Sequence, residues 1–355
     1  MNALFDLLRC PQCRSRLDLS WFSDGDGVLD CTCGLWFPVI DQIPRIFIGE
    51  MRQIYRSDFG EFLDRHRLGD GARHGTSAET AAKLATRESF GFEWTHFSEM
   101  LPDWEKNSRF YFEPLGDDGL RGQLVFEGGC GKGRHTYWAL KAGARMISVD
   151  FSRAVEVARA NCRELPGDRL FVQADLMALP FDDGTFDVAF SLGVLHHLPD
   201  PEGGFRRLTA LVRPGGRVLV YLYHALEGEP LKRAILRAVA GVRRVTTRLP
   251  HRVLLPLTNA LGYGLYAGVV MPYRLLSRFA ATRALAERFP LKGYADYPVR
   301  VIVNDQFDRF SAPIENRYRR DEVNDWLERA GLTHTAILPG AGWRAVGQQP
   351  KSSNS

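Results

Sequence analysis

The sequence predicts an α/β protein with a largely parallel sheet, helices on both of its faces, a small N-terminal ribbon and a helical insertion. Strand-like and helix-like segments alternate between residues 122 and 224, which is typical of a parallel sheet whose strands are joined by helices. Four of the six cysteines lie within the first 33 residues. A long segment after residue 225 is rich in arginine and poor in acids.

The composition excludes few functions by itself. The 355 residues are 45% hydrophobic and 25% charged, with a formal net charge of +4, which allows one large core or two smaller ones. So small a charge does not indicate nucleic-acid binding. The N-terminus has no basic segment followed by a long apolar run, so we expect a cytoplasmic protein. In that reducing compartment, cysteines serve as metal ligands or buried thiols rather than as disulfides.

The N-terminal cysteines form two short pairs, Cys10 and Cys13 in CPQC and Cys31 and Cys33 in CTC. Two such pairs joined by a hairpin bring four sulfur atoms together, as tetrahedral zinc requires, and DGDG between them is a turn signal. The alternatives are four unrelated buried thiols, or a ribbon that has lost its metal. With PVIDQIPRI, these motifs resemble the small zinc ribbons that accompany tRNA methyltransferases or precede methyltransferase domains, although the second pair is tighter than usual. We therefore predict a zinc-ribbon domain over 1–48.

The segment 49–121 is polar and mixed, with an aromatic cluster in FGFEWTHF and a helical WEKNSRFYFEPL. We predict helices that cover a sheet edge. The flat apolar rings of the cluster also suit a cap over a ligand, so a cofactor-side role remains the alternative.

The first core strand ends in FEGGCGKGRH, which contains Gly129, Gly131 and Gly133. This spacing differs from the G-x-G-x-x-G dinucleotide fingerprint, and Lys132 is followed by glycine instead of the Ser or Thr of a phosphate-binding loop. Glu127 places a negative charge beside the turn. A bound phosphate would be repelled there, so the turn predicts a different ligand.

Acids also end the next two strands. Asp150 follows the turn at about the ~20-residue interval at which an acid accepts ribose hydroxyls, and Asp175 ends the third strand, where a carboxylate can meet an adenine amine. Ligands of parallel sheets bind at these carboxyl ends. With Glu127, the three acids suit a ligand with an ammonium, a ribose and an adenine, which describes S-adenosylmethionine.

The motifs VFEGGCGKGRH, ISVDFS, FVQADLMALPF, FDVAFSLGVLHHL and LVRPGGRVLVYLY resemble, in order and spacing, those of class I S-adenosylmethionine-dependent methyltransferases of the small-molecule type. The resemblance implies a Rossmann-like, seven-stranded sheet and S-adenosylmethionine as cofactor. It implies that Glu127 binds the amino group of the cofactor, that the three glycines let the backbone approach the cofactor closely, and that Asp150 holds the ribose. The family more often has aspartate at position 127.

The resemblance extends to residues around the adenine. Phe151 would pack on the base, while Asp175 and Leu176 would read its edge, and Ser191 would belong to the same site. Arg134 opens the next helix, where it would reach the cofactor carboxylate or remain a solvated first-turn residue.

The segment SLGVLHHLPDP should line the acceptor side. It lacks both the Asn/Asp-Pro-Pro-aromatic tetrad of nucleobase amine methylases and the Pro-Cys nucleophile of pyrimidine methylases, which disfavours nucleic acid. His196 is the candidate general base for a hydroxyl acceptor, although such histidines are often structural. We expect an oxygen or carbon acceptor on a small biosynthetic molecule, nitrogen being less favoured.

The insertion at 225–298 should choose the substrate. Across 225–290, Lys232 and ten arginines face three glutamates, and 11 minus 3 gives a local excess of +8. The run from Val253 to Tyr273 has no charged side chain and is near membrane-spanning length. Because Pro256, Asn259 and several glycines interrupt it, we predict a buried pair of short helices. The segment would be a lid over a large lipophilic or anionic substrate, a membrane-surface contact or a solvated cover.

Residues 299–347 are predicted to complete the sheet with an extended loop, a helix ending at Gly331 and two strands, before a tail over 348–355. The predicted domains are thus 1–48, 49–121, 122–224, 225–298 and 299–347. An S-adenosylmethionine-dependent methyltransferase is the main hypothesis. The alternatives are an RNA base methyltransferase, because ribosomal guanine enzymes also carry a zinc ribbon, and a non-catalytic cofactor-binding partner protein.

Overall fold

The chain folds into two compact units. The computed structural model describes residues 3–22, 25–69, 76–116, 118–287 and 291–351. Residues Met1–Glu227 with Ile314–Ser355 form one unit, here called the core unit, and Gly228–Pro313 form the other, the insertion unit. Residue 24 of the predicted DGDG turn and residues 352–355 of the predicted tail lie outside the described residues.

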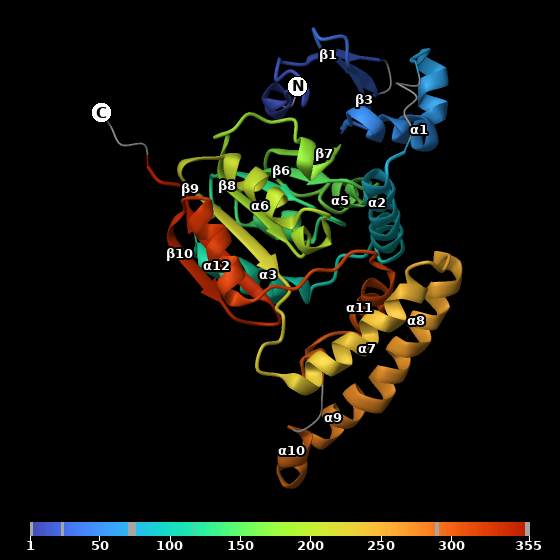
Figure 1. Ribbon diagram of the computed structural model, residues 1–355, viewed down its shortest axis with the longest axis vertical. Coiled ribbons are helices and arrows are strands. Elements are labelled where there is room, and N and C mark those ends of the chain that lie inside the picture. The colour runs from blue at the N-terminus through green and yellow to red at the C-terminus, as the bar shows by residue number, and fades with distance from the viewer. Residues whose placement is uncertain (1–2, 23–24, 70–75, 117, 288–290, 352–355) are drawn as a thin grey trace. The chain divides into compact units, whose positions relative to one another are not determined.

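An eleven-stranded sheet crosses the core unit in the order β1-β2-β3-β4-β7-β6-β5-β8-β9-β11-β10 (Figure 1). The central strands β7, β6, β5, β8 and β9 are parallel, and β11 and β10 follow antiparallel at one edge. The strands are β1 (Asp18–Trp21), β2 (Gly27–Asp30), β3 (Trp36–Ile40), β4 (Ile43–Ile46), β5 (Leu124–Gly128), β6 (Arg145–Asp150), β7 (Arg169–Ala174), β8 (Phe186–Leu192), β9 (Val212–Leu222), β10 (Thr333–Leu338) and β11 (Trp343–Gln348).

Helices complete the core unit. They are α1 (Gln53–His66), α2 (Ala78–His96), α3 (Trp104–Phe112), α4 (Arg134–Lys141), α5 (Ala154–Asn161), α6 (Pro201–Ala210) and α12 (Arg320–Arg329), with short turns η1 (Ala3–Leu7), η2 (Gly49–Arg52), η3 (Glu113–Leu115), η4 (Leu176–Ala178) and η5 (Leu195–His197). Successive strand residues enter opposite apolar cores, Phe126 on one face and Val125 on the other. Both faces of the parallel strands are therefore buried, as the continuous apolar runs predict. In sheet order, the seven strands β7, β6, β5, β8, β9, β11 and β10 confirm the predicted Rossmann-like sheet.

The ribbon continues the same sheet. Strand β4 pairs in parallel with β7, with Arg45 opposite Gln173 and Ile46 opposite Ala174, and every residue of β4 is buried. Without β4, the backbone groups of β7 would form an exposed sheet edge. The predicted separate domain over 1–48 is thus part of the core unit.

The insertion unit is helical. Its elements are α7 (Pro230–Thr246), α8 (His251–Leu265), the π-helical turn η6 (Tyr266–Val270), α9 (Met271–Leu276), α10 (Ala280–Ala286), η7 (Lys292–Asp296) and α11 (Val299–Ser311). Helix α11 corrects the predicted extended loop and moves the boundary from 298 to Pro313. It packs so closely on α8 that a Cβ added to Gly262 would lie 2.8 Å from the Cα of Val303. This long-range packing stabilises a helix that local sequence signals did not indicate.

The predicted buried pair of short helices is wrong. Residues His251–Leu276 form one helical segment. Its most apolar window of 18 residues has a mean hydropathy of 1.4, and 22% of that window is buried. Pro256 lies within α8, and the π turn precedes Pro272. A wider turn accommodates a proline ring that lacks an N–H donor, so the helical run continues. Among the described residues, it is the one helix long and apolar enough to cross a membrane by length and composition.

Candidate active site

The glycine turn after β5 has a backbone that only glycine adopts readily. Gly129, Gly131 and Gly133 have φ values of +80°, +51° and +82°. A Cβ on Gly129 would lie 2.4 Å from a methyl of Val194, and one on Gly133 would lie 2.9 Å from the Cα of Ala158. The turn thus combines left-handed conformations with close approach, and it brings the start of α4 to the carboxyl end of β5.

Glu127 is almost completely buried directly before this turn. Its carboxylate accepts a hydrogen bond from the hydroxyl of Thr136, whose oxygen lies 2.9 Å from that of Ser148. Burial raises the pKa of Glu127 to about 8; the Thr136 bond and Arg134 oppose the shift, and Asp150 adds to it. A buried carboxyl of this kind gains much from a cation placed beside it, because the cation offsets the cost of desolvating the charged form.

Asp150 ends β6 and shapes the same turn. One carboxylate oxygen accepts the Gly131 N–H at 2.7 Å, and the other accepts the backbone N–H and hydroxyl of Ser152 at 2.8 and 2.7 Å. Burial raises its pKa, while these hydrogen bonds oppose the shift. Asp150 therefore couples the glycine turn to the segment that follows β6.

The predicted adenine residues lie at the ends of β6 and β7. Asp175 accepts the Met177 N–H at 2.9 Å and lies 3.2 Å from the Nζ of Lys83. Leu176 is buried against the strand end, since a Cβ on Gly128 would lie 2.7 Å from its methyl group. Phe151 is half-buried, and its ring lies edge-on to that of Phe47 at 5.8 Å.

Helix α2 runs along this edge of the sheet. Lys83, Arg87, Phe90 and Trp94 recur at helical spacing and contact, in turn, Asp175, the Phe151 carbonyl, the His197 ring and Gly131. These partners follow four different strands. The aromatic cluster therefore belongs to a helix that covers this edge of the sheet, as predicted, while its cofactor-side role stays a prediction. The role of Lys83 had no local sequence signal.

Two predicted cofactor residues have other partners in the structure. The hydroxyl of Ser191, which is fully buried, donates to the Gly128 carbonyl at 2.8 Å, so it supports the glycine turn from beneath. The guanidinium of Arg134 lies 4.7 Å from the centre of the Trp104 ring, a cation–π distance. Direct cofactor contacts of these two residues stay predictions.

The histidine pair follows β8. His196 is fully buried, with its ring 3.9 Å from that of Tyr223 and 4.3 Å from that of His197. The Nδ1 of His197 lies 2.6 Å from the Ile314 carbonyl oxygen. The surroundings of His196 favour a packing role over proton transfer, and its role as a base stays a prediction.

The predicted zinc ligands converge. The sulfur atoms of Cys10, Cys13, Cys31 and Cys33 all lie within 4.8 Å of one another. Four thiol sulfurs on two short loops are the donor set of a closed structural zinc site. The residues present thus fit the metal, although the second pair is separated by a single residue.

Comparisons with known proteins show which domains the chain contains. Residues 126–220 match the family described as "Methyltransferase domain", and residues 2–41 match "Trm112p-like protein". A ubiquinone biosynthesis O-methyltransferase of Ralstonia nicotianae is 32% identical over 173 residues, which are 45% of this chain and 70% of the relative. A 27-O-demethylrifamycin SV methyltransferase of Amycolatopsis mediterranei is 35% identical over 101 residues, which are 27% of this chain and 37% of the relative.

Several other relatives are matched over about half of their length or less. Magnesium protoporphyrin IX methyltransferase from Synechocystis PCC 6803 has a TM-score of 0.40 and 14% identity, with 84% of this chain and 97% of that chain covered. Fold and site define a methyltransferase with a parallel, Rossmann-like sheet. The chain belongs to the class I S-adenosylmethionine-dependent methyltransferases. It is an enzyme rather than a non-catalytic partner, and S-adenosylmethionine is its methyl donor.

Proposed function

We propose that this protein methylates a hydroxyl oxygen of a small, lipophilic, biosynthetic molecule. The observation that carries the proposal is the match to a ubiquinone biosynthesis O-methyltransferase over 70% of that relative, on a chain whose strand ends carry the acids of the donor site. The second relative is named for methylation of 27-O-demethylrifamycin SV. A carbon acceptor is the second choice.

Bound S-adenosylmethionine supplies a methyl group on a positively charged sulfur. In this chain, Glu127 would hold the ammonium group and Asp150 the ribose, while Asp175 and Leu176 would contact the adenine edge. Helix α2 would exclude water from the same edge. Catalysis would then come mainly from holding donor and acceptor in near-attack positions. The acceptor hydroxyl would lose its proton as it is methylated, either to water or to His196.

The test measures S-adenosylhomocysteine formation with hydroxylated aromatic acceptors that bear or lack a long alkyl chain. We expect turnover with the alkylated acceptor and a higher KM for its short analogue. Methyl transfer to RNA alone, abolished by ribonuclease, would contradict the proposal. His196→Gln separates the two roles of that residue. A packing role predicts that the variant loses a similar fraction of its activity at every pH. A general base predicts instead that the fall in activity at low pH disappears from the pH profile of the variant.

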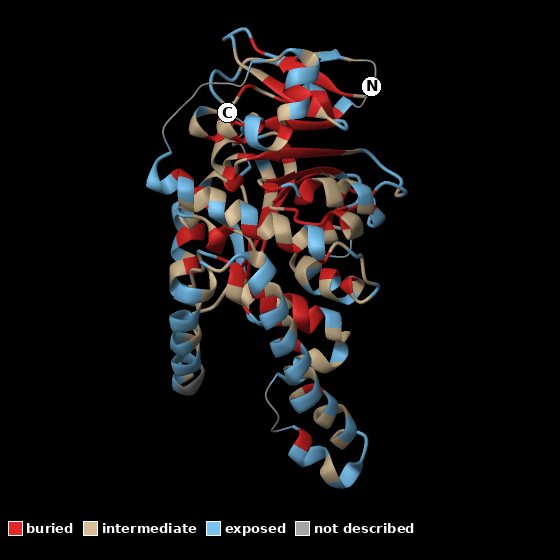
Figure 2. Ribbon diagram, turned by 90° about the vertical axis from the view of Figure 1, so that its right-hand side faces the viewer, coloured by how far each residue is buried: buried red, intermediate tan, exposed pale blue. Residues whose placement is uncertain are grey.

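We also propose that the insertion unit contacts the cytoplasmic surface of a membrane. Its exposed apolar side chains include Val253, Leu257, Leu261 and Leu275 on α8 and α9, spaced so that they share one face of the helical segment. About half of the described residues of this unit are exposed, and Figure 2 shows pale blue residues along its helices. Soluble surfaces seldom carry such a stripe without a partner.

The charge of the unit supports a membrane as its partner. No acidic residue occurs between Glu229 and Glu287, a segment with nine arginines and one lysine. On α7, the exposed Arg237 and Arg244 lie seven residues apart and thus on one helical face. Apolar stripes flanked by arginines suit a surface of anionic lipids.

Peripheral contact fits this unit better than a membrane span. The opposite face of α8 buries Leu254, Thr258 and Gly262, and it packs on α11, which carries polar residues such as Asn304 and Gln306. Such a helix would bring polar groups into the hydrocarbon, at high cost. The lid role of the unit stays a prediction.

Vesicle sedimentation tests the contact. We expect binding to vesicles with phosphatidylglycerol and little binding to pure phosphatidylcholine. Arg237→Glu with Arg244→Glu should weaken binding more than tenfold at low salt, because each basic residue near such a surface contributes about 1 kcal/mol. Arg163→Glu, an exposed arginine of the core unit, is the matched control. Equal binding of all variants to both vesicles would refute the proposal, and fractionation of cells would test the cytoplasmic location.

A further inference from the structure

The ribbon reaches the cofactor side of the sheet through one buried arginine. Arg45 is completely buried in β4, and its guanidinium donates to the side-chain oxygen of Gln173 at 2.9 Å and to Glu156 at 3.0 Å. Burial lowers its pKa to about 10, so it remains charged at neutral pH. Tyr55 donates its hydroxyl to the Arg45 carbonyl at 2.7 Å, which holds β4 in place.

Arg45 determines which way the Gln173 amide faces. An arginine has only donors, so the Gln173 oxygen must point to it and the amide nitrogen to the other side. That nitrogen donates to the Phe151 carbonyl at 3.1 Å. The orientation of one amide thus carries a constraint from the ribbon to the segment after β6.

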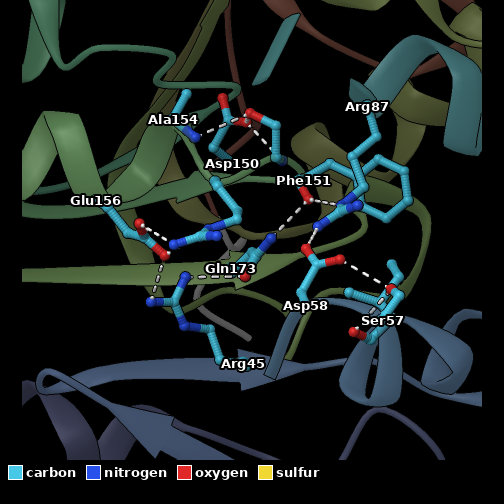
Figure 3. A network of polar contacts seen from close by, with 12 residues as sticks. Arg45, Ser57, Asp58, Arg87, Asp150, Phe151, Ala154, Glu156 and Gln173 are labelled. Carbon is cyan, nitrogen blue, oxygen red and sulfur yellow. Dashed lines mark hydrogen bonds and ion pairs between the residues drawn. The ribbon is translucent and has the colours of Figure 1, made fainter. Parts of the chain in front are cut away.

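A second donor reaches the same carbonyl from the helices that follow the ribbon. The Nε of Arg87 on α2 lies 3.2 Å from the Phe151 oxygen, and its guanidinium forms an ion pair with Asp58 of α1. Figure 3 shows these two donors converging on Phe151. The ion pair limits the freedom of Arg87 and so directs its Nε.

Phe151 stands between the two ends of a tight local network. Asp150 precedes it, and the following residue, Ser152, donates both its backbone N–H and its hydroxyl to Asp150. Any movement of the Phe151 carbonyl would therefore turn both the Asp150 carboxylate and the Phe151 ring. These are the groups expected to hold the ribose and adenine.

We infer that Arg45 and Arg87 are positioning residues for the cofactor site, and that the ribbon acts on cofactor affinity through Gln173. Neither arginine needs to touch the cofactor, since both act through the Phe151 carbonyl. The inference goes beyond the proposed acceptor, because it concerns binding of the donor alone. It holds whichever molecule is methylated.

The test is calorimetric titration of the whole protein with S-adenosylhomocysteine. Arg45→Met should weaken binding about five- to tenfold, because the Gln173 amide loses the partner that orients it, which amounts to the loss of about one net hydrogen bond. Arg9→Met is the matched control, since Arg9 joins the ribbon to Asp182 of the core at 2.7 Å without contact to Phe151. Its affinity should stay within twofold of the wild type.

A double-mutant cycle distinguishes positioning from general destabilisation. If Arg45 acts through Gln173, Arg45→Met should have little further effect on affinity in a Gln173→Leu background. The inference would be overturned if the separate effects of Arg45→Met and Gln173→Leu on affinity multiplied in the double variant. Equal affinities of the Arg45→Met and Arg9→Met proteins would also overturn it. Where thermal unfolding shows that Arg45→Met does not fold, Arg87→Gln decides, because the ribbon then remains intact. Its expected loss of affinity is about threefold or more, and wild-type affinity would refute the inference.

Discussion

Glu127 should release a proton when the cofactor binds. Its pKa of about 8, raised mainly by burial, leaves the carboxyl largely protonated at neutral pH. Binding an ammonium group beside it favours the carboxylate, because the two charges then pair in a site closed to water. The proton must therefore leave as the ligand enters.

The number of protons released follows from the pKa of Glu127. With a pKa of about 8, roughly 0.9 of a proton should be released at pH 7, and affinity should rise nearly tenfold between pH 6 and pH 7. The ligand's own amino group has an ordinary pKa of about 7.7–8.0. At pH 6 and 7 that group is mostly charged, so measurements there report mainly the protein.

The assay is titration with S-adenosylhomocysteine in buffers of different ionisation enthalpy. The slope of observed heat against buffer enthalpy counts released protons. Glu127→Gln is the control, because it removes the carboxyl but leaves Asp150, whose pKa is also raised by burial. A wild-type slope equal to that of the Gln variant at pH 7 would refute the reasoning.

The same shift affects the stability of the free protein. The folded state binds this proton more tightly than the unfolded chain, in which the pKa is about 4.5. Its contribution to the free energy of unfolding is thus complete below about pH 4.5 and is lost as the pH rises through 8, by something of the order of 4 kcal/mol. Chemical unfolding at pH 6 and 8 should show a steeper loss for the wild type than for Glu127→Gln.

Three other predictions concern the turn, the ribose site and the ribbon. Gly133→Ala should destabilise the fold by about 2 kcal/mol or more in chemical unfolding, because backbone strain adds to a close contact with Ala158. Gly143→Ala is the control, since Gly143 has a similar φ of +87° but its nearest atom would lie 3.6 Å away. That variant should lose only the stability that backbone strain removes. Asp150→Asn should weaken S-adenosylhomocysteine binding about tenfold or more by calorimetry; unchanged affinity would remove Asp150 from the site. Zinc chelation should lower the melting temperature of the wild type and leave that of Cys31→Ser unchanged, and identical responses of the two proteins would exclude a structural metal.

The parallel core could be predicted because its signals are local. Each strand of β5 to β9 is a short apolar run that ends in a turn, and parallel strands bring their carboxyl ends to one edge. Glu127, Asp150 and Asp175 therefore lie along the same edge, although up to 48 residues separate them in the sequence. The four cysteines converge for a similar reason, since two short knuckles are joined by a hairpin.

Other features had no local signal. Residues 299–311 form a helix because α8 offers them an apolar face, and Gly262 permits the close approach to Val303. The continuous segment 251–276 contains Pro256 within α8 and accommodates Pro272 after a π turn. Both outcomes depend on partners or backbone adjustments that composition does not reveal.

The sequence by itself determined the sheet and the methyl donor, and it placed three acids at neighbouring strand ends, because strand periodicity and the strand-end motifs lie within short windows. Tertiary structure decided how the ribbon is used. The pairing of β4 with β7 joins residues more than 120 positions apart and places Arg45 against Gln173. Such pairing satisfies backbone groups of an edge strand that has no sequence preference for its neighbour, so only the folded chain shows that the ribbon reaches Phe151.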